Sequence, residues 1–125
     1  MQTWYGIDIG GTKIELVACD ATLVVHHRQR VATPTRDYAA FLQAIVDLVD
    51  AADAALGQRG VAVGIGLPGV RDRASGRQLS ANVPSLTGHT VGADLQARLQ
   101  RPLELGNDLQ CFALSEAHDL SLIHI

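Results

Sequence analysis

The sequence predicts an α/β fold in which a mixed sheet carries helices on its faces. Three short β-rich segments follow one another near the start of the chain, between residues 4 and 31. The apolar pattern then takes a helical period over residues 37–56. Strand-like and helix-like segments alternate after this point. A meander that is followed by alternating units is typical of a mixed sheet with helices packed against it.

The first three segments are expected to pair as the meander. Residues 4–9 are apolar and bounded by glycine, which indicates a buried strand. Residues 13–19 are the natural partner across the Gly10-Gly11 turn. Residues 23–31 are rich in valine and follow a second turn, and Thr33-Pro34-Thr35 then breaks the strand pattern.

The later elements are predicted from the spacing of their apolar residues and from the residues at their ends. The helix over residues 37–56 has apolar side chains at helical spacing, and Gly57 follows it as a C-cap. The elements expected after it are a buried strand (61–67), a polar turn (71–77) with Gly76 at its tip, a helix (94–99), a short strand (103–105) and a last helix (109–117).

The composition is that of one globular domain with a real core. The chain has 125 residues, of which 47% are hydrophobic and 18% charged. Ten basic and thirteen acidic residues give a net charge of −3, so no basic excess points to nucleic acid or to an anionic membrane. Cys19 and Cys111 lack metal-ligand spacing and are typical of free thiols. Without an evident signal peptide or membrane span, we expect a cytoplasmic protein.

The motif Asp8-Ile9-Gly10-Gly11-Thr12-Lys13 lies between the first two predicted strands. Glycines let backbone N–H groups approach a phosphate, while Thr12 offers a hydroxyl and Lys13 a charge. Asp8 could hold a water molecule of a Mg²⁺ ion, which prefers carboxylates, waters and phosphates. A plain hairpin turn also accounts for a Gly-Gly pair, and local sequence alone slightly favours that interpretation.

The segment from Gly64 to Gly69 formally matches a dinucleotide-binding fingerprint. That fingerprint must open a helix, whereas the residues after Pro68 are turn-like. We expect Gly64 and Gly66 to pack inside a strand, and Pro68-Gly69 to make a sharp turn that brings the backbone close to a ligand. A turn without a ligand explains the pattern equally well.

Polar residues follow two further segments. Asn107-Asp108 stands between a strand and a helix, where an aspartate can be a general base, although a helix N-cap is favoured locally. Asn82 lies in an irregular polar segment, residues 80–88, and could contact a polyol such as a sugar. An Asx-turn before Pro84 is the favoured local interpretation. The five histidines show no convergent spacing and are not expected to be ligands.

Taken together, four segments resemble the N-terminal part of ROK-family sugar kinases, within the actin-like, ribonuclease H-like ATPase fold. They read GIDIGGTKIELV, GIGLPG, ANVPSLTG and NDLQCFALSEA, and the match runs from about Tyr5 to about His118. Each segment alone is weak, but four in order at family-like spacing are specific. The residues in these segments are most similar to those of members that act on N-acetyl-D-glucosamine, while fructokinase and glucokinase members share the general pattern.

The resemblance implies a role for each matching segment. The first segment corresponds to a phosphate loop for ATP, with Asp8 near Mg²⁺ through water. Asp108 matches the catalytic base that removes the proton from the sugar 6-hydroxyl. Asn82 and Asn107 match sugar-contacting positions, with the Gly69 backbone nearby. The positions assigned to ATP are Gly6, Ile7, Asp8, Ile9, Gly10, Gly11, Thr12 and Lys13.

The resemblance also implies a domain division. Residues 1–118 correspond to the N-terminal lobe, and we interpret residues 119–125 as a truncated or non-native tail. Family members carry a second lobe with another phosphate loop, an adenosine pocket and a cysteine-rich zinc site, so zinc is expected only there. We expect little or no activity from this chain alone. The full-length protein would bind sugar and ATP, not nucleic acid or membrane, and a homodimer is compatible with the resemblance.

Two other function classes share parts of this layout. Ribonuclease H-like nucleases cluster carboxylates around two metal ions, and the candidates here are Asp8, Glu15, Asp108 and Glu116. Such a nuclease needs no Gly-Gly-Thr loop and favours a more basic surface. ROK relatives also include sugar-responsive repressors, whose helix-turn-helix precedes the sugar-binding lobe. The first predicted strand starts at Trp4 and leaves no room for one.

Overall fold

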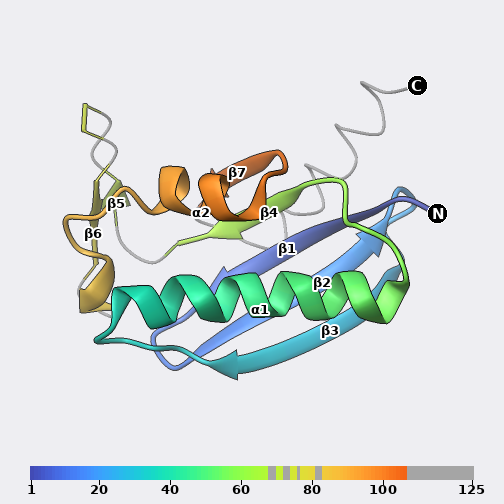
Figure 1. The fold of residues 1–125 in the computed structure, drawn as a ribbon, viewed down its shortest axis with the longest axis horizontal. Helices are drawn as coiled ribbons and strands as arrows, with labels where there is room; N and C mark the ends of the chain where they lie inside the picture. The colour runs from blue at the N-terminus through green and yellow to red at the C-terminus, as the bar shows by residue number, and fades with distance from the viewer. Residues whose placement is uncertain (68–69, 72–73, 76, 81–82, 107–125) are drawn as a thin grey trace.

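A computed structural model describes residues 1–67, 70–71, 74–75, 77–80 and 83–106. Strands and helices follow one another largely in the predicted order (Figure 1). The elements are β1 (Thr3–Ile9), β2 (Lys13–Asp20), β3 (Val25–Ala32), α1 (Tyr38–Leu56), β4 (Val63–Gly66), β5 (Val70–Arg71), β6 (Gln78–Leu79), the short 3₁₀ helix η1 (Pro84–Leu86), α2 (Val91–Leu99) and β7 (Leu103–Gly106).

The main sheet has five strands in the order β3-β2-β1-β4-β7. β1, β2 and β3 form an antiparallel meander, whereas β1 pairs with β4 and β4 with β7 in parallel. Parallel neighbours need a crossover connection, and α1 and α2 lie in these two crossovers. The sheet is therefore mixed and carries helices, which confirms the predicted fold class.

The parallel strands end at one edge of the sheet. Asp8 on β1 is the register partner of Gly66 on β4, and Gly66 is the partner of Gly106 on β7. Because all three strands run in the same direction, the chain leaves each of them on the same side. Ligands of open α/β sheets gather at such an edge.

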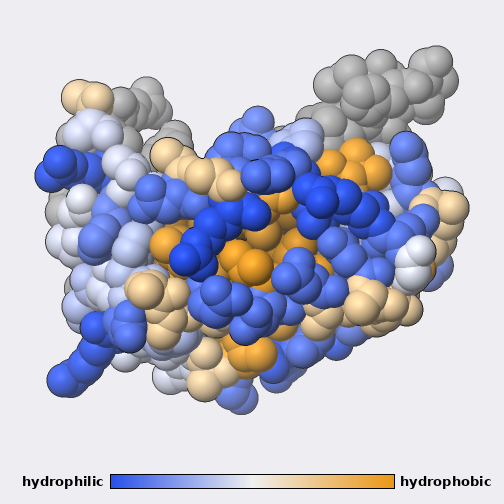
Figure 2. All heavy atoms as spheres, in the orientation of Figure 1, coloured by the Kyte–Doolittle hydropathy of each residue, from blue (hydrophilic) through white to orange (hydrophobic). Residues whose placement is uncertain are grey.

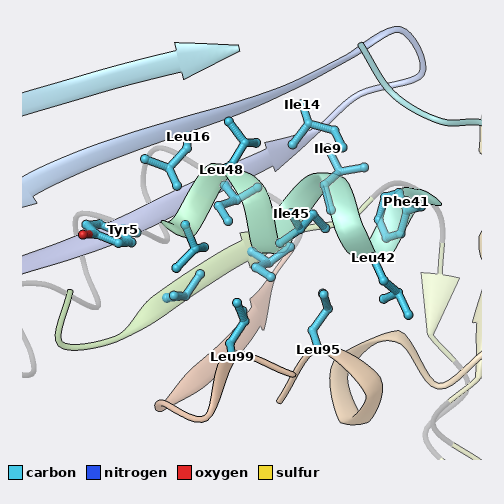
Figure 3. Close-up of a cluster of buried hydrophobic side chains, with 14 of the residues drawn as sticks. Tyr5, Ile9, Ile14, Leu16, Phe41, Leu42, Ile45, Leu48, Leu95 and Leu99 are labelled. Carbon is cyan, nitrogen blue, oxygen red and sulfur yellow. The ribbon is translucent and has the colours of Figure 1, made fainter. Parts of the chain in front are cut away.

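The main core lies between one face of the sheet and both described helices (Figure 3). Alternate residues of β1 point to this face, where Tyr5, Ile7 and Ile9 are buried. Ile45 and Leu48 of α1 pack against the strands in Figure 3. Figure 2 shows the same side of the molecule, with polar residues over most of the surface and apolar atoms between them at the centre.

The opposite face of the sheet has a smaller apolar cluster of Trp4, Cys19 and Ala62. Gly6 of β1 and Gly64 of β4 are register partners on this face, and both are buried. The prediction that Gly64 and Gly66 pack inside a strand is confirmed, since β4 contains both.

Local signals set both ends of α1 as predicted. The Asp37 carboxylate accepts a hydrogen bond of 3.1 Å from the Ala40 amide and caps the N-terminus. Gly57 takes a left-handed conformation, with φ of 66°, and closes the C-terminus. No helix among the described residues is long and apolar enough to cross a membrane.

The structure differs from the sequence-based elements in three places. α2 begins at Val91, three residues before the predicted start, and its first turn contains Gly92, where a Cβ would come within 2.8 Å of Leu105 Cδ1. The predicted polar turn is flanked by a small sheet of β5 and β6. The segment expected to be irregular and polar contains η1, and its Val83 and Leu86 belong to the core.

Candidate functional site

The loop between β1 and β2 consists of Gly10, Gly11 and Thr12. Ile9 and Ile14 are the last register partners of the two strands. The Gly10 amide donates a hydrogen bond of 2.9 Å to the Lys13 carbonyl, which closes the hairpin. Among the described residues, nothing accepts a hydrogen bond from the amides of Gly11 and Thr12. Two exposed amides next to each other are suited to an anion such as a phosphate.

The predicted nucleotide-binding positions differ in exposure, and Gly10 is half-buried between an exposed and a buried group. Asp8, Gly11, Thr12 and Lys13 are exposed and can contact a ligand. The positions that are buried in the sheet, and that can only shape the strand from which the loop emerges, are Gly6, Ile7 and Ile9.

Asp8 projects from the last part of β1, on the sheet face opposite α1. Its register partner on β2 is Glu15, which forms ion pairs with Arg28 and Arg30 of β3. The Glu15 carboxylate is therefore already neutralised by two guanidinium groups. Within the described ranges, no group of three or more His, Cys, Asp or Glu side chains could hold a metal ion. Glu15 is accordingly a poor metal ligand, and the other candidates of the nuclease alternative, Asp108 and Glu116, lie outside the described residues.

The other predicted site residues follow strands that end beside Asp8. Gly69 comes shortly after β4, and Asn107-Asp108 comes directly after β7. These residues and Asn82 lie outside the described residues. The strand directions, on which the sequence-based site depended, bring the ends of β1, β4 and β7 to one edge.

Two hydroxyl side chains clamp the segment that contains Asn82. The Thr87 hydroxyl accepts a hydrogen bond from the Ser80 amide and donates one to the Ser80 carbonyl, both at 3.0 Å. The Ser80 hydroxyl accepts another, at 3.1 Å, from the Val83 amide. This clamp was not predicted, and its sequence signal is that two hydroxyl residues, Ser80 and Thr87, flank the apolar pair Val83 and Leu86.

Residues 33–35 form a strap that contacts both of these segments. Thr33 makes two hydrogen bonds to the loop between β1 and β2, from its amide to the Thr12 carbonyl and from its hydroxyl to the Gly10 carbonyl. At the other end, the Ser85 amide donates to the Thr35 carbonyl at 3.1 Å. Sequence analysis assigned this segment only the role of ending a strand.

A tyrosine with a strongly raised pKa, Tyr5, lies away from this edge, near the amino ends of β1 and β4. Burial, and then the hydrogen bond of 2.7 Å to Asp53, raise the pKa of Tyr5 well above its usual range. Burial alone would raise the pKa of Asp53, but hydrogen bonds from Arg101, Tyr5 and Gly60 outweigh it and lower the pKa. This network joins α1 to the starts of β4 and β7 and is structural.

Comparison with known proteins agrees with this geometry. The model of the ROK family matches residues 4–121. An N-acetyl-D-glucosamine kinase of Salmonella arizonae is 50% identical over 116 residues, covering 93% of this chain and 38% of that protein. The counterpart of Salmonella typhimurium is 49% identical over the same length. This chain thus spans well under half of the curated relatives that it matches.

Solved structures give the same result at lower identity. A ROK hexokinase from Thermus thermophilus superposes with a TM-score of 0.75 at 28% identity, over 84% of this chain and 35% of that one. A ROK glucokinase from Streptomyces griseus, solved with glucose and AMPPNP, gives a TM-score of 0.71 at 28% identity, over 84% and 33%. With a family model that covers nearly its whole length, this chain belongs to the ROK family.

Proposed function

We propose that this chain is the N-terminal lobe of a two-lobe kinase that transfers the terminal phosphate of ATP to the 6-hydroxyl of N-acetyl-D-glucosamine. Membership of the ROK family supports the reaction class. The identity of 50% to a relative named N-acetyl-D-glucosamine kinase supports the sugar. Solved ROK structures named as hexokinase and glucokinase are 28% identical, which makes a glucokinase of the same family the second candidate.

The observation that carries the proposal is the alignment of Asp8, Gly66 and Gly106 across adjacent strands. Neighbouring strands lie about 4.8 Å apart, so the first and last of these positions are separated by about 10 Å. The segments proposed to hold the phosphates, the sugar and the base all leave the sheet within that width. Phosphoryl transfer depends mainly on positioning donor and acceptor together, and one edge can position both.

On the nucleotide side, the exposed amides of Gly11 and Thr12 would donate hydrogen bonds to phosphate oxygens. Lys13 adds a positive charge beside them. A Mg²⁺ ion bound with ATP would neutralise the charge of the transferring phosphate. The exposed carboxylate of Asp8 at the strand end fits such an ion through a water molecule, since Mg²⁺ usually keeps several waters.

On the sugar side, Asn82, Asn107 and the Gly69 backbone would orient the hexose. Asp108 would accept the proton of the 6-hydroxyl while its oxygen attacks the terminal phosphate of ATP. The bond from that phosphorus to the bridging oxygen of ADP breaks in the same step. A base within hydrogen-bonding distance of the attacking hydroxyl is what this transfer needs.

The proposal includes a second lobe that closes the cleft and completes the nucleotide site. The isolated 125-residue chain would then turn over slowly or not at all. ATP as the donor and the buried free thiol of Cys19 suit a cytoplasmic enzyme. The zinc site implied by the family resemblance would belong to the second lobe.

The test is a phosphotransfer assay on the complete protein that begins with this lobe. N-acetyl-D-glucosamine, N-acetylmannosamine, glucose and fructose are compared under identical conditions with ATP and Mg²⁺. The largest kcat/KM is expected for N-acetyl-D-glucosamine, with 6-phosphate as the product. A preference for glucose or fructose would replace the sugar in the proposal, and transfer to none of the four would reject the function.

A further inference from the structure

Thr33 contacts the loop between β1 and β2 through two different groups. Its hydroxyl donates a hydrogen bond of 2.9 Å to the Gly10 carbonyl. Its amide donates a hydrogen bond of 3.0 Å to the Thr12 carbonyl. The two acceptors flank Gly11, so one residue of the strap holds the loop on both sides of its central glycine.

These contacts fix the orientation of two peptide groups. No described peptide bond is cis, and in a trans peptide the C=O and the following N–H point in opposite directions. When Thr33 holds the Gly10 carbonyl, the Gly11 amide must point away from Thr33. The same relationship directs the Lys13 amide away when the Thr12 carbonyl is held. The strap therefore holds the carbonyls of Gly10 and Thr12 and turns the amides of Gly11 and Lys13 away from it.

Without such a restraint, the loop could present the wrong groups to an anion. Consecutive glycines are the most freely rotating peptides in a chain. Rotation of the Gly10-Gly11 peptide would replace an N–H donor by a carbonyl oxygen, which repels phosphate. Hydrogen-bond donors that are already oriented toward an anion do not have to reorganise when it binds.

Thr33 itself is held firmly enough to serve this purpose. It follows Ala32, the last residue of β3, which is the register partner of Lys13. It precedes Pro34, and a residue before proline is confined to extended conformations. Its branched side chain has few χ1 options. The strap is anchored beyond Pro34 by the hydrogen bond from Ser85 to Thr35.

We infer that Thr33 is a positioning residue of the phosphate loop, which orients the Gly11 amide toward the nucleotide without touching it. The inference deepens the proposed function and rests on it. Thr33 is expected to affect the binding of ATP and the rate of transfer, while leaving the binding of the sugar unchanged.

The kinetic test compares Thr33→Val with Thr33→Ser in the complete protein. Valine keeps the shape of threonine but removes the hydroxyl, and serine restores it. We expect Thr33→Val to raise the KM for ATP roughly 5- to 10-fold, the size of one lost hydrogen bond, with the KM for sugar unchanged. Thr33→Ser should stay near wild type. Equal changes in both KM values, or no change, would overturn the inference.

Thr22→Val is the matched control. The Thr22 hydroxyl also donates to a neighbouring loop oxygen, at 2.7 Å from Asp20 Oδ1, but in the turn before β3 at the other end of the meander. Its loss should leave the KM for ATP at the wild-type value. A rise equal to that of Thr33→Val would mean that any loosened turn has the same effect, and would overturn a specific role for Thr33.

A second measurement separates this inference from the proposed function. Amide hydrogen exchange at Gly11 and Thr12 is followed in the complete protein, with and without a non-hydrolysable ATP analogue and Mg²⁺. The analogue should slow exchange at both amides in the wild type, and in Thr33→Val it should slow exchange at the Gly11 amide much less. If no sugar is phosphorylated, the proposed function fails, but this difference still supports the role of Thr33. Equal protection in both proteins overturns that role.

Discussion

Asp8 at the end of β1 lies directly beside Gly66 at the end of β4, because the two are register partners in a parallel pair. Their side-chain positions share the sheet face opposite α1. Asp8 is exposed, whereas Gly66 is buried and places no side chain beside the Asp8 carboxylate.

The proposed general base is tested by Asp108→Asn in the complete protein. Asparagine keeps the size of the side chain but cannot accept the proton from the 6-hydroxyl. We expect kcat to fall roughly 10²- to 10⁴-fold, with the dissociation constant for the sugar nearly unchanged by calorimetry. Wild-type turnover in this variant would end the assignment.

Asp37→Asn is the matched control for this substitution. Asp37 caps the N-terminus of α1, and asparagine is an equally good cap. Turnover should stay at the wild-type level. A comparable loss there would show that an Asp→Asn change can impair the protein through its fold, which would make the effect at Asp108 uninformative about proton transfer.

The fold was predictable wherever local chemistry set it. Asp37 and Gly57 determine the ends of α1 through their own hydrogen bonds and backbone angles, and the sequence predicted a helix over residues 37–56 with Gly57 as its C-cap. The start of α2 was not predicted, because Gly92 disfavours a helix locally, and the closeness of Leu105 of β7, which leaves no room for a Cβ there, is visible only in the fold. η1 was missed because Val83 becomes a core residue only through packing that is distant in sequence.

The site was predictable to a similar extent. The glycine loop after β1 was visible because a Gly-Gly pair between two strand-like segments is a common hairpin signal. The shared edge followed from the predicted order of elements only once the strand directions were known. The role of Thr33 depends on the register that places Ala32 opposite Lys13. The local sequence predicts that β2 and β3 pair, but it does not determine which residues are opposite each other.

The clamp between Thr87 and Ser80 is expected to serve the sugar side of the proposed cleft. Thr87→Val removes a hydroxyl that both accepts from and donates to the backbone of Ser80. The segment around Asn82 should then be less well held, and the KM for sugar should rise roughly 5-fold, with the KM for ATP unchanged. This is the reverse of the pattern expected for Thr33→Val. Steady-state kinetics with each substrate varied in turn decides between them.

Two further variants make that prediction specific. Thr87→Ser should restore the wild-type KM for sugar, because it retains the hydroxyl. Thr90→Val removes a nearby hydroxyl whose contact with Asp94 is long, at 3.5 Å, and should have no effect on either KM. An increase in the KM for ATP in Thr87→Val, with sugar unaffected, would contradict a role on the sugar side.

Acid is expected to weaken the protein through Asp53. Its folded-state pKa is lowered, so its contribution to stability is present above the ordinary pKa of aspartate, about 3.9, and is lost as the pH falls through the folded value. Asp53→Asn leaves the buried Arg101 guanidinium without its countercharge, which should cost roughly 3 kcal/mol at pH 7. The variant should also lose less stability than the wild type does as the pH falls below the ordinary pKa of aspartate, because it has no carboxylate to protonate at this position.

Urea unfolding at several pH values measures both effects. Asp47→Asn, on the exposed side of α1, is the control and should change the free energy of unfolding by less than about 0.5 kcal/mol. If the free energy of unfolding of Asp53→Asn falls with decreasing pH as much as that of the wild type, other carboxylates account for the loss of stability in acid.

Gly60 is expected to be the least replaceable described glycine for stability. A Cβ atom there would lie 2.5 Å from Cζ of Tyr5 and 2.6 Å from Cε2. The ring cannot move aside freely, because it is buried and its hydroxyl is held by Asp53 at 2.7 Å. Gly60→Ala should therefore destabilise the fold by about 1–3 kcal/mol in urea unfolding, through overpacking.

The overpacking mechanism can be distinguished from a general loss of glycine flexibility. Gly57→Ala meets no atom within 4 Å and strains only the backbone, at φ of 66°, so its cost should be near 1 kcal/mol and independent of Tyr5. In a Tyr5→Leu background the ring atoms are absent, and Gly60→Ala should lose most of its cost. A double-mutant cycle should then show a coupling of about 1 kcal/mol or more between residues 5 and 60. Additive effects would mean that the ring does not oppose the added methyl group, and that the cost at Gly60 arises from its backbone alone.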